Sequence, residues 1–177
     1  MNRWRGRLIG LAIVIIGVTG GAAIAALGGV WSPSSPASST AAAQQLVVRG
    51  WDDEILLRLP LPAGHFALRY RNSLYGSLAE ERFAVGADGM MELVGLAADE
   101  AAVLDEYYAT AGPQPAAAGD SRRWHAQPIA RLRLERLTVA ATEHGRRTLL
   151  VGDRQIPLWQ LAAGGAPTVV LEVEPPR

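Results

Sequence analysis

The chain has no charged side chain between Arg7 and Arg49. The first part of this stretch, Leu8 to Val30, consists mainly of Leu, Ile, Val, Ala and Gly. As an α-helix these residues would be roughly 34 Å long, which is enough to cross the hydrocarbon core of a bilayer. The stretch therefore predicts one N-terminal transmembrane helix, with the lipid bilayer as its partner.

Charge predicts the orientation of this helix. Three arginines precede the apolar segment, and no Arg or Lys follows it before Arg49. Because the positively charged flank stays in the cytoplasm, we expect a single-pass protein of a bacterial cytoplasmic membrane with its body in the periplasm or at the cell exterior. Cleavage is the open alternative, since Leu8 to Val18 has signal-peptide length and small residues follow it.

The chain divides into three parts on this interpretation. Residues 1–31 are the cytoplasmic tip and membrane anchor, or the signal peptide. Residues 32–43 contain Pro33 and Pro36 among small polar residues and predict a flexible linker. Residues 44–177 have the usual size of a single domain with one core.

Small residues recur at every fourth position of the apolar segment, at Gly17, Gly21, Ala25 and Gly29. On a helix they share one face, which would allow a second membrane helix to approach closely. Such a stripe suits a homodimer or docking onto a larger membrane protein. An Ala- and Gly-rich helix also produces this spacing by chance, and the oligomeric state stays open.

Composition excludes several functions. Without the three N-terminal arginines, 14 basic residues face 17 acidic ones, which disfavours nucleic acid as a partner. The absence of cysteine excludes thiol catalysis and Cys-ligated metal. No nucleophile elbow, P-loop or dinucleotide fingerprint is present. We therefore expect no cofactor and no enzymatic activity.

No metal site is expected either. Asp52-Asp53-Glu54 is interpreted as a solvated acidic turn, because it lacks the pattern of a calcium loop. His65, His125 and His144 have no metal-ligand spacing.

The body is expected to be mainly β, as an antiparallel sandwich or open barrel, because its apolar residues alternate and turn formers interrupt them every eight to twelve residues. The expected strands are Gln45 to Arg49, Ile55 to Leu59, His65 to Arg71, Ala79 to Val85, Met90 to Leu96, Ile129 to Leu134, Leu137 to Ala141, Thr148 to Val151, Gln155 to Trp159 and Thr168 to Val173. Asp99 to Thr110 has helical spacing and is left open between a short helix and a loop.

A hairpin in the middle of the body contains the best candidate site. Its register is predicted from apolar pairs, Leu68 opposite Phe83 and Phe66 opposite Val85. This register sets Tyr70 opposite Glu81 on the inner face.

The candidate polar cluster consists of Tyr70, Asn72, Ser73 and Glu81. A carboxylate on an apolar face is costly unless it is hydrogen-bonded, and tyrosine hydroxyl and asparagine amide groups are suitable donors. The cluster is either a structural network that holds the loop after Asn72 or a polar pocket that binds a ligand.

The same residues carry a resemblance. Phe66-Ala67-Leu68-Arg69-Tyr70-Arg71-Asn72-Ser73-Leu74 followed by Glu80-Glu81-Arg82-Phe83 resembles an uncharacterised bacterial family of small exported domains. Its members show Phe, Tyr, His-Ser-Val and then Glu-x-Phe at this spacing, and they are typically encoded beside TRAP transporters of the TAXI type. Leu149 to Leu158 and Gly165 to Val173 resemble the closing strands of that family. Asn72 stands where the family has its His, so no imidazole titrates there.

The resemblance implies association with a transporter rather than a particular chemistry. The expected function is a non-catalytic accessory or binding module of a TRAP-type (TAXI) transporter, whose membrane subunit would be the partner. The alternatives are a general cell-envelope interaction or structural domain, and an enzyme centred on Glu81 and Tyr70.

Overall fold

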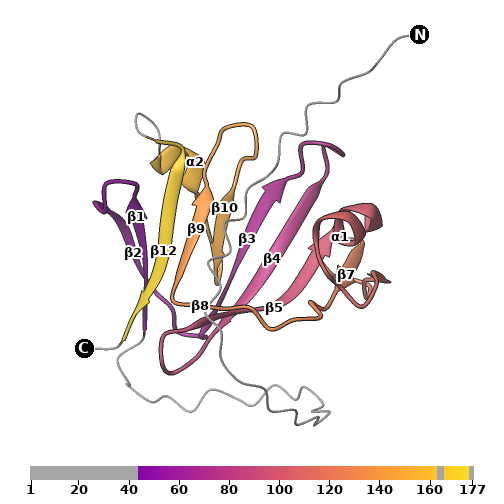
Figure 1. Ribbon diagram of the computed structural model, residues 1–177, viewed down its shortest axis with the longest axis horizontal. Coiled ribbons are helices and arrows are strands. Elements are labelled where there is room, and N and C mark those ends of the chain that lie inside the picture. Colours follow the sequence, from indigo (N-terminus) through magenta and orange to yellow (C-terminus); the bar gives the residue numbers. More distant parts are fainter. Residues whose placement is uncertain (1–43, 163–165, 176–177) are drawn as a thin grey trace. The chain divides into compact units, whose positions relative to one another are not determined.

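The structure, a computed structural model, describes residues 44–162 and 166–175 (Figure 1). The expected membrane segment, the linker and the stripe of Gly17, Gly21, Ala25 and Gly29 lie outside these residues. Among the helices that the structure describes, none is both long and apolar enough to cross a bilayer.

The described part of the chain is built mainly from strands. Strands β1 to β5 are Gln45–Gly50, Ile55–Pro60, His65–Arg71, Leu78–Val85 and Met91–Ala98. Helix α1 is Ala101–Tyr107, and β6 to β9 are Gln114–Pro115, Trp124–Ala126, Arg133–Leu134 and Arg136–Ala140. Strands β10 and β11 are Thr148–Val151 and Arg154–Pro157, α2 is Leu158–Leu161, and β12 is Thr168–Glu174.

The strands form two antiparallel sheets, which confirms the predicted mainly β, antiparallel class. The smaller sheet has the order β2-β1-β12-β9, and the larger has the order β11-β10-β3-β4-β5-β7-β6 with β8 paired to β5. The larger sheet runs across the domain in Figure 1, with β3 and β4 at its centre.

Alternating apolar residues of both sheets meet in one core. Leu46 and Leu171 come from the smaller sheet, whereas Leu68 and Leu149 come from the larger one, and all four are fully buried. The rings of Phe66 and Phe83 stack within this core, with their centroids 5.0 Å apart. Burial of each such side chain stabilises the fold by about 1.5–3 kcal/mol.

A second, smaller core lies under α1. Val103 and Leu104 of the helix are fully buried and pack with Leu96 and Ala98 of β5. Asp99 to Thr110, left open between a short helix and a loop, thus contains a short helix over Ala101–Tyr107.

The hairpin register differs from the prediction by two residues. Phe66, and not Leu68, lies opposite Phe83, and Leu68 lies opposite Glu81. A shift of two residues leaves every side chain on its face, so alternation alone could not detect the error. The loop decides the register, because Asn72 N–H donates to Ser77 O at 2.8 Å and closes a short turn.

Two other strand predictions were wrong in extent. Of Ile129 to Leu134, only the last two residues are strand. Strand β11 ends at Pro157, where the chain turns into α2 as Leu158 N–H donates to Arg147 O at 2.9 Å. Strands β6 and β7 were not predicted, because two- and three-residue strands show no usable alternation.

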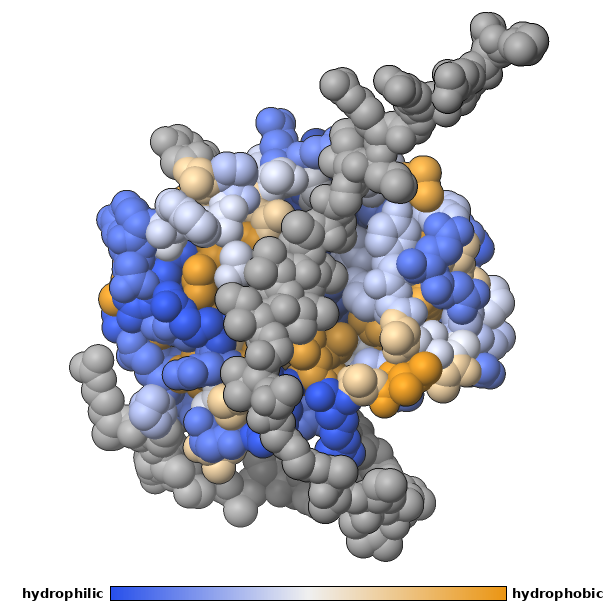
Figure 2. All heavy atoms as spheres, viewed as in Figure 1, coloured by the Kyte–Doolittle hydropathy of each residue, from blue (hydrophilic) through white to orange (hydrophobic). Residues whose placement is uncertain are grey.

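Charged side chains cover the outer face of the smaller sheet. Arg58 Nη2 lies 2.8 Å from Glu174 Oε1, and Arg136 Nε lies 3.5 Å from Glu172 Oε2. Val47, which points to this face, is nevertheless fully buried. Figure 2 shows the hydrophilic side chains gathered over β1 and β2, on the left.

The turn between β4 and β5 requires glycine at position 89. Gly89 has φ +80°, and a Cβ there would lie 3.3 Å from Val173 O. We expect Gly89→Ala to lower the free energy of unfolding by about 2 kcal/mol, through left-handed strain and this contact. Gly152→Ala is the control, because Gly152 has φ +55° but a Cβ there would have no atom within 4 Å. It should lower the free energy of unfolding by about 1 kcal/mol. Equal losses in urea titrations would contradict the contact.

Candidate functional site

The candidate site lies on the inner face of β4, between the two cores. Glu81 lies opposite Leu68 of the first core on one side and Leu96 of the second core on the other. Glu81 is only 8% exposed. An ionised carboxylate in such surroundings requires partners for both oxygens.

A chain of two tyrosines reaches the first oxygen. The Tyr108 hydroxyl donates to Glu81 Oε1 at 2.7 Å. The Tyr70 and Tyr108 hydroxyl oxygens are 2.6 Å apart. Because Tyr108 uses its proton on the carboxylate, Tyr70 is the donor of the second bond. The chain therefore runs from Tyr70 through Tyr108 to Glu81.

Arg147 binds the second oxygen. Its Nη1 lies 3.3 Å from Glu81 Oε2, and both side chains are 11% exposed. The same guanidinium lies over the Tyr70 ring, 4.6 Å from its centroid. Arg147 immediately precedes β10, so the site joins α1, β3, β4 and β10.

Burial changes the acidity of both tyrosines. It raises the pKa of Tyr70 to about 12. It also raises the pKa of Tyr108 well above the ordinary value, and the nearby Glu81 carboxylate adds to the effect. Both hydroxyls are therefore protonated at neutral pH and act as donors, in keeping with the direction of the chain.

This raised pKa predicts alkaline destabilisation. The unfolded chain releases the Tyr70 proton near pH 10, whereas the folded chain holds it until about pH 12. Stability from Tyr70 is thus complete below pH 10 and is lost as the pH rises to 12, by about 2–3 kcal/mol. In urea titrations between these pH values, Tyr70→Phe should make the free energy of unfolding fall less steeply with pH than in the parent. Tyr107→Phe, at an exposed position, is the control and should leave this slope as it is in the parent. Equal slopes in the two variants would refute the assignment.

Asn72 and Ser73 do not join this chain. Asn72 Oδ1 accepts from the backbone N–H groups of Leu74 and Tyr75, both at 3.0 Å, so its side chain supports its own loop. Ser73 is exposed in that loop. Of the four predicted residues, the structure brings only Tyr70 and Glu81 into one network.

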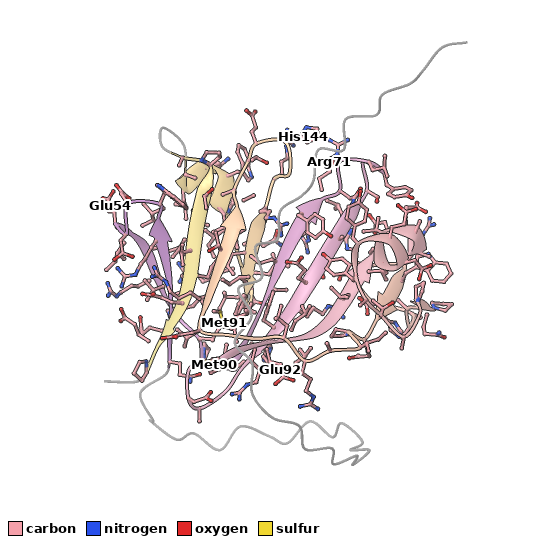
Figure 3. The ribbon with its side chains drawn as sticks, in the orientation of Figure 1. Glu54, Arg71, Met90, Met91, Glu92 and His144 are labelled. Carbon is pink, nitrogen blue, oxygen red and sulfur yellow. The ribbon has the colours of Figure 1, made fainter. Side chains whose placement is uncertain are left out.

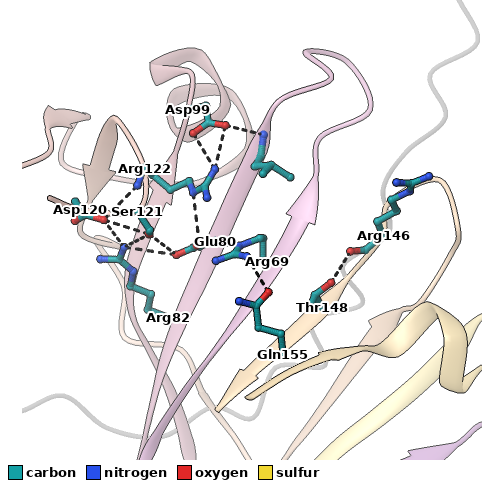
Figure 4. Close-up of polar contacts among 11 residues, drawn as sticks. Arg69, Glu80, Arg82, Asp99, Asp120, Ser121, Arg122, Arg146, Thr148 and Gln155 are labelled. Atoms are coloured by element: carbon teal, nitrogen blue, oxygen red, sulfur yellow. Dashed lines mark hydrogen bonds and ion pairs between the residues drawn. The ribbon is translucent and has the colours of Figure 1, made fainter. Parts of the chain in front are cut away.

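A second carboxylate, Glu80, is buried on the opposite face of β4. It is 4% exposed and lies among three arginines (Figure 4). Arg69 Nε donates to its Oε1 at 3.0 Å, and Arg122 Nε lies 3.4 Å from the same oxygen. Arg82 Nη2 is 3.6 Å from Oε2, to which the Ser121 hydroxyl donates at 3.1 Å.

This network holds the tip of the β6–β7 hairpin against the sheet. Arg82 donates to Asp120 at 2.9 Å, and Arg122 Nη1 contacts both oxygens of Asp99, at 3.0 and 3.1 Å. Small residues on β5 leave space for these side chains, because Gly95 lies opposite Arg82 in the sheet. Three arginines and three carboxylates balance one another here.

Sequence reasoning missed Tyr108 and Arg147. They lie 27 and 66 positions from Glu81 along the chain. Tyr108 lies within Asp99 to Thr110, where helical spacing of apolar residues was the available signal. For Arg147 no sequence signal existed, since an arginine before a strand is ordinarily solvated.

The other constellations show no assembled site. In the ranges 44–162 and 166–175, no group of three or more acidic or His residues is placed to hold a metal ion. Asp52-Asp53-Glu54 is exposed at the β1–β2 turn. Trp51 is 71% exposed, whereas Trp124 and Trp159 are half-buried.

Comparison with known proteins provides no assignment. No family model, curated protein or solved structure matches the chain.

Proposed function

We propose that this chain is a membrane-anchored, extracytoplasmic β-sandwich domain that acts without catalysis, as an accessory or binding module of a TRAP-type (TAXI) transporter. The apolar segment after Arg7 and the resemblance around Tyr70 and Glu81 support the location and the partner.

The satisfied state of Glu81 is the observation that supports a non-catalytic role. One carboxylate oxygen accepts from Tyr108 and the other pairs with Arg147. A general acid or base must reach a substrate proton within hydrogen-bond distance, whereas this carboxylate is enclosed and bonded to the domain itself. The network is what a structural junction between two cores requires.

The test is copurification of the tagged full-length chain with the membrane subunit of the transporter from a detergent extract, together with solute uptake after deletion. Stoichiometric recovery and reduced uptake would support the proposal. Recovery as a lone monomer with unchanged uptake would refute it. Binding to a cell-envelope polymer or another envelope protein, with uptake unaffected, would favour the general envelope domain instead.

A further inference from the structure

Two arginines without an acidic partner meet at one end of the domain. Arg71, Arg146 and Arg154 are the arginines of the described residues that form no ion pair, whereas the others each have a carboxylate partner. All three are exposed. In a domain that otherwise balances its arginines, unpaired guanidinium groups are available to a partner.

Arg71 and Arg146 are neighbours. Strand β10 pairs with β3, and Thr148 opposite Arg69 is the last pair of this ladder. Arg71 N–H donates to Gly145 O at 2.8 Å, so the two segments remain together beyond the ladder. Figure 3 shows Arg71 and His144 beside each other at this end.

This arrangement costs stability. Two like charges on adjoining segments repel each other. Arg146 also has φ +45°, which is unfavourable for a residue with a side chain. Among the described residues no carboxylate forms an ion pair with Arg71 or Arg146 to offset this repulsion, which favours an acidic partner from outside the domain.

A hydrogen-bonded loop with an exposed apolar side chain adjoins the arginines. Arg71 Nε donates to Gly76 O at 3.1 Å, and Gly76 N–H donates to Asn72 O at 2.8 Å. This loop presents Leu74 at 67% exposure and Tyr75 at 38%, and the Tyr75 hydroxyl donates to Glu106 Oε1 at 2.6 Å. On the other side of the arginines, the Arg146 guanidinium lies 5.9 Å from the centroid of Trp159.

We infer that this end, defined by Arg71, Leu74, His144, Arg146 and Trp159 and called here the loop end, binds a carboxylate-bearing protein segment that also carries apolar side chains. Guanidinium groups bind carboxylates bidentately, and aromatic and Arg side chains are typical anchors of interfaces.

An anionic membrane is a poorer fit. Lipid-binding patches generally contain four to eight Lys or Arg residues, whereas the loop end has two arginines and His144. The acidic Glu143 lies in the same loop. The chain also enters the domain at the opposite end, where Gln44 Nε2 donates to Gly86 O at 2.7 Å.

The inference rests on the proposed role as a binding module, but not on the identity of the transporter. The test uses the full-length chain in non-ionic detergent and a fluorescein-labelled peptide of alternating Glu and Leu, with fluorescence anisotropy as the readout. A peptide with Gln in place of Glu is the probe control. Arg154→Gln is the matched variant. Arg154, the first residue of β11, also forms no ion pair, but it lies opposite Val151, at the end of β10 away from Arg146.

We expect the acidic peptide to bind, and its affinity to fall with rising salt. Arg71→Gln combined with Arg146→Gln should weaken binding at least tenfold, as the loss of two charge-assisted hydrogen bonds implies, with a thermal midpoint no lower than that of the parent. Arg154→Gln should bind like the parent.

The inference would be overturned if the Gln peptide bound as tightly as the Glu peptide, or if Arg154→Gln lost as much affinity as the double variant. It would also be overturned if the acidic peptide showed no binding up to about 1 mM. Preferential binding to phosphatidylglycerol vesicles through the same arginines would overturn it in favour of a membrane surface. If the peptide does not bind but copurification is intact, the inference fails and the proposed function stands. If the peptide binds but copurification fails, the proposed function fails and the inference stands.

Discussion

Arg147→Met is expected to lower the free energy of unfolding by about 3–5 kcal/mol. The substitution keeps an apolar stem but leaves Glu81 Oε2 buried without its guanidinium partner. It also removes the cation over the Tyr70 ring. Most of the loss comes from the stranded carboxylate, because removing one partner of a buried pair leaves the desolvation cost of the other in place. Urea unfolding at pH 7 measures it.

Arg123→Met is the control for this substitution. Arg123 is 69% exposed, and its nearest carboxylate contact, to Glu100, is 3.8 Å long. Exposed pairs of this kind contribute at most about 1 kcal/mol. Comparable losses in the two variants would mean that Arg147 does not stabilise Glu81.

Glu80→Gln is expected to cost about 3 kcal/mol. The amide has nearly the shape of the carboxylate, but the charge that balances Arg69, Arg82 and Arg122 is gone. Asp99 and Asp120 remain, so one positive charge is left uncompensated beneath the hairpin tip. We also expect faster amide hydrogen exchange across residues 116–123, because the tip is held through Ser121, Asp120 and Arg122.

The control for this network is Glu92→Gln. Glu92 is on the neighbouring strand and pairs at 3.3 Å with Arg131, whose side chain is 84% exposed. Glu92→Gln should lower the free energy of unfolding by less than about 1 kcal/mol. If Glu80→Gln costs no more than Glu92→Gln and exchange at the tip is unchanged, the hairpin is held by backbone contacts alone.

Alternation was a good guide to strands and a poor guide to their pairing. His65–Arg71 and Thr148–Val151 were predicted residue for residue, because one buried face imposes a period of two on them. The register of the central hairpin could not be predicted in the same way. It depends on the turn that Asn72 builds with Ser77, and a two-residue slip keeps the same faces buried.

The site was predicted only in part, for a related reason. A tyrosine and a glutamate on an apolar face signalled a buried polar network around Tyr70 and Glu81. Its other members, Tyr108 and Arg147, come from distant elements whose position depends on how α1 and β10 pack. Asn72 shared the alternation of Tyr70, but the chain leaves the strand at that residue and the side chain turns into its own loop.

The central claim is that Glu81 is part of a structural junction, and a double-mutant cycle tests it most directly. The cycle compares the unfolding free energies of Glu81→Gln, Arg147→Met, the double variant and the parent. We predict a coupling energy of about 1–3 kcal/mol, because each residue compensates the other. Losses that add to within about 0.5 kcal/mol would show that the two side chains do not stabilise each other, and would contradict the account.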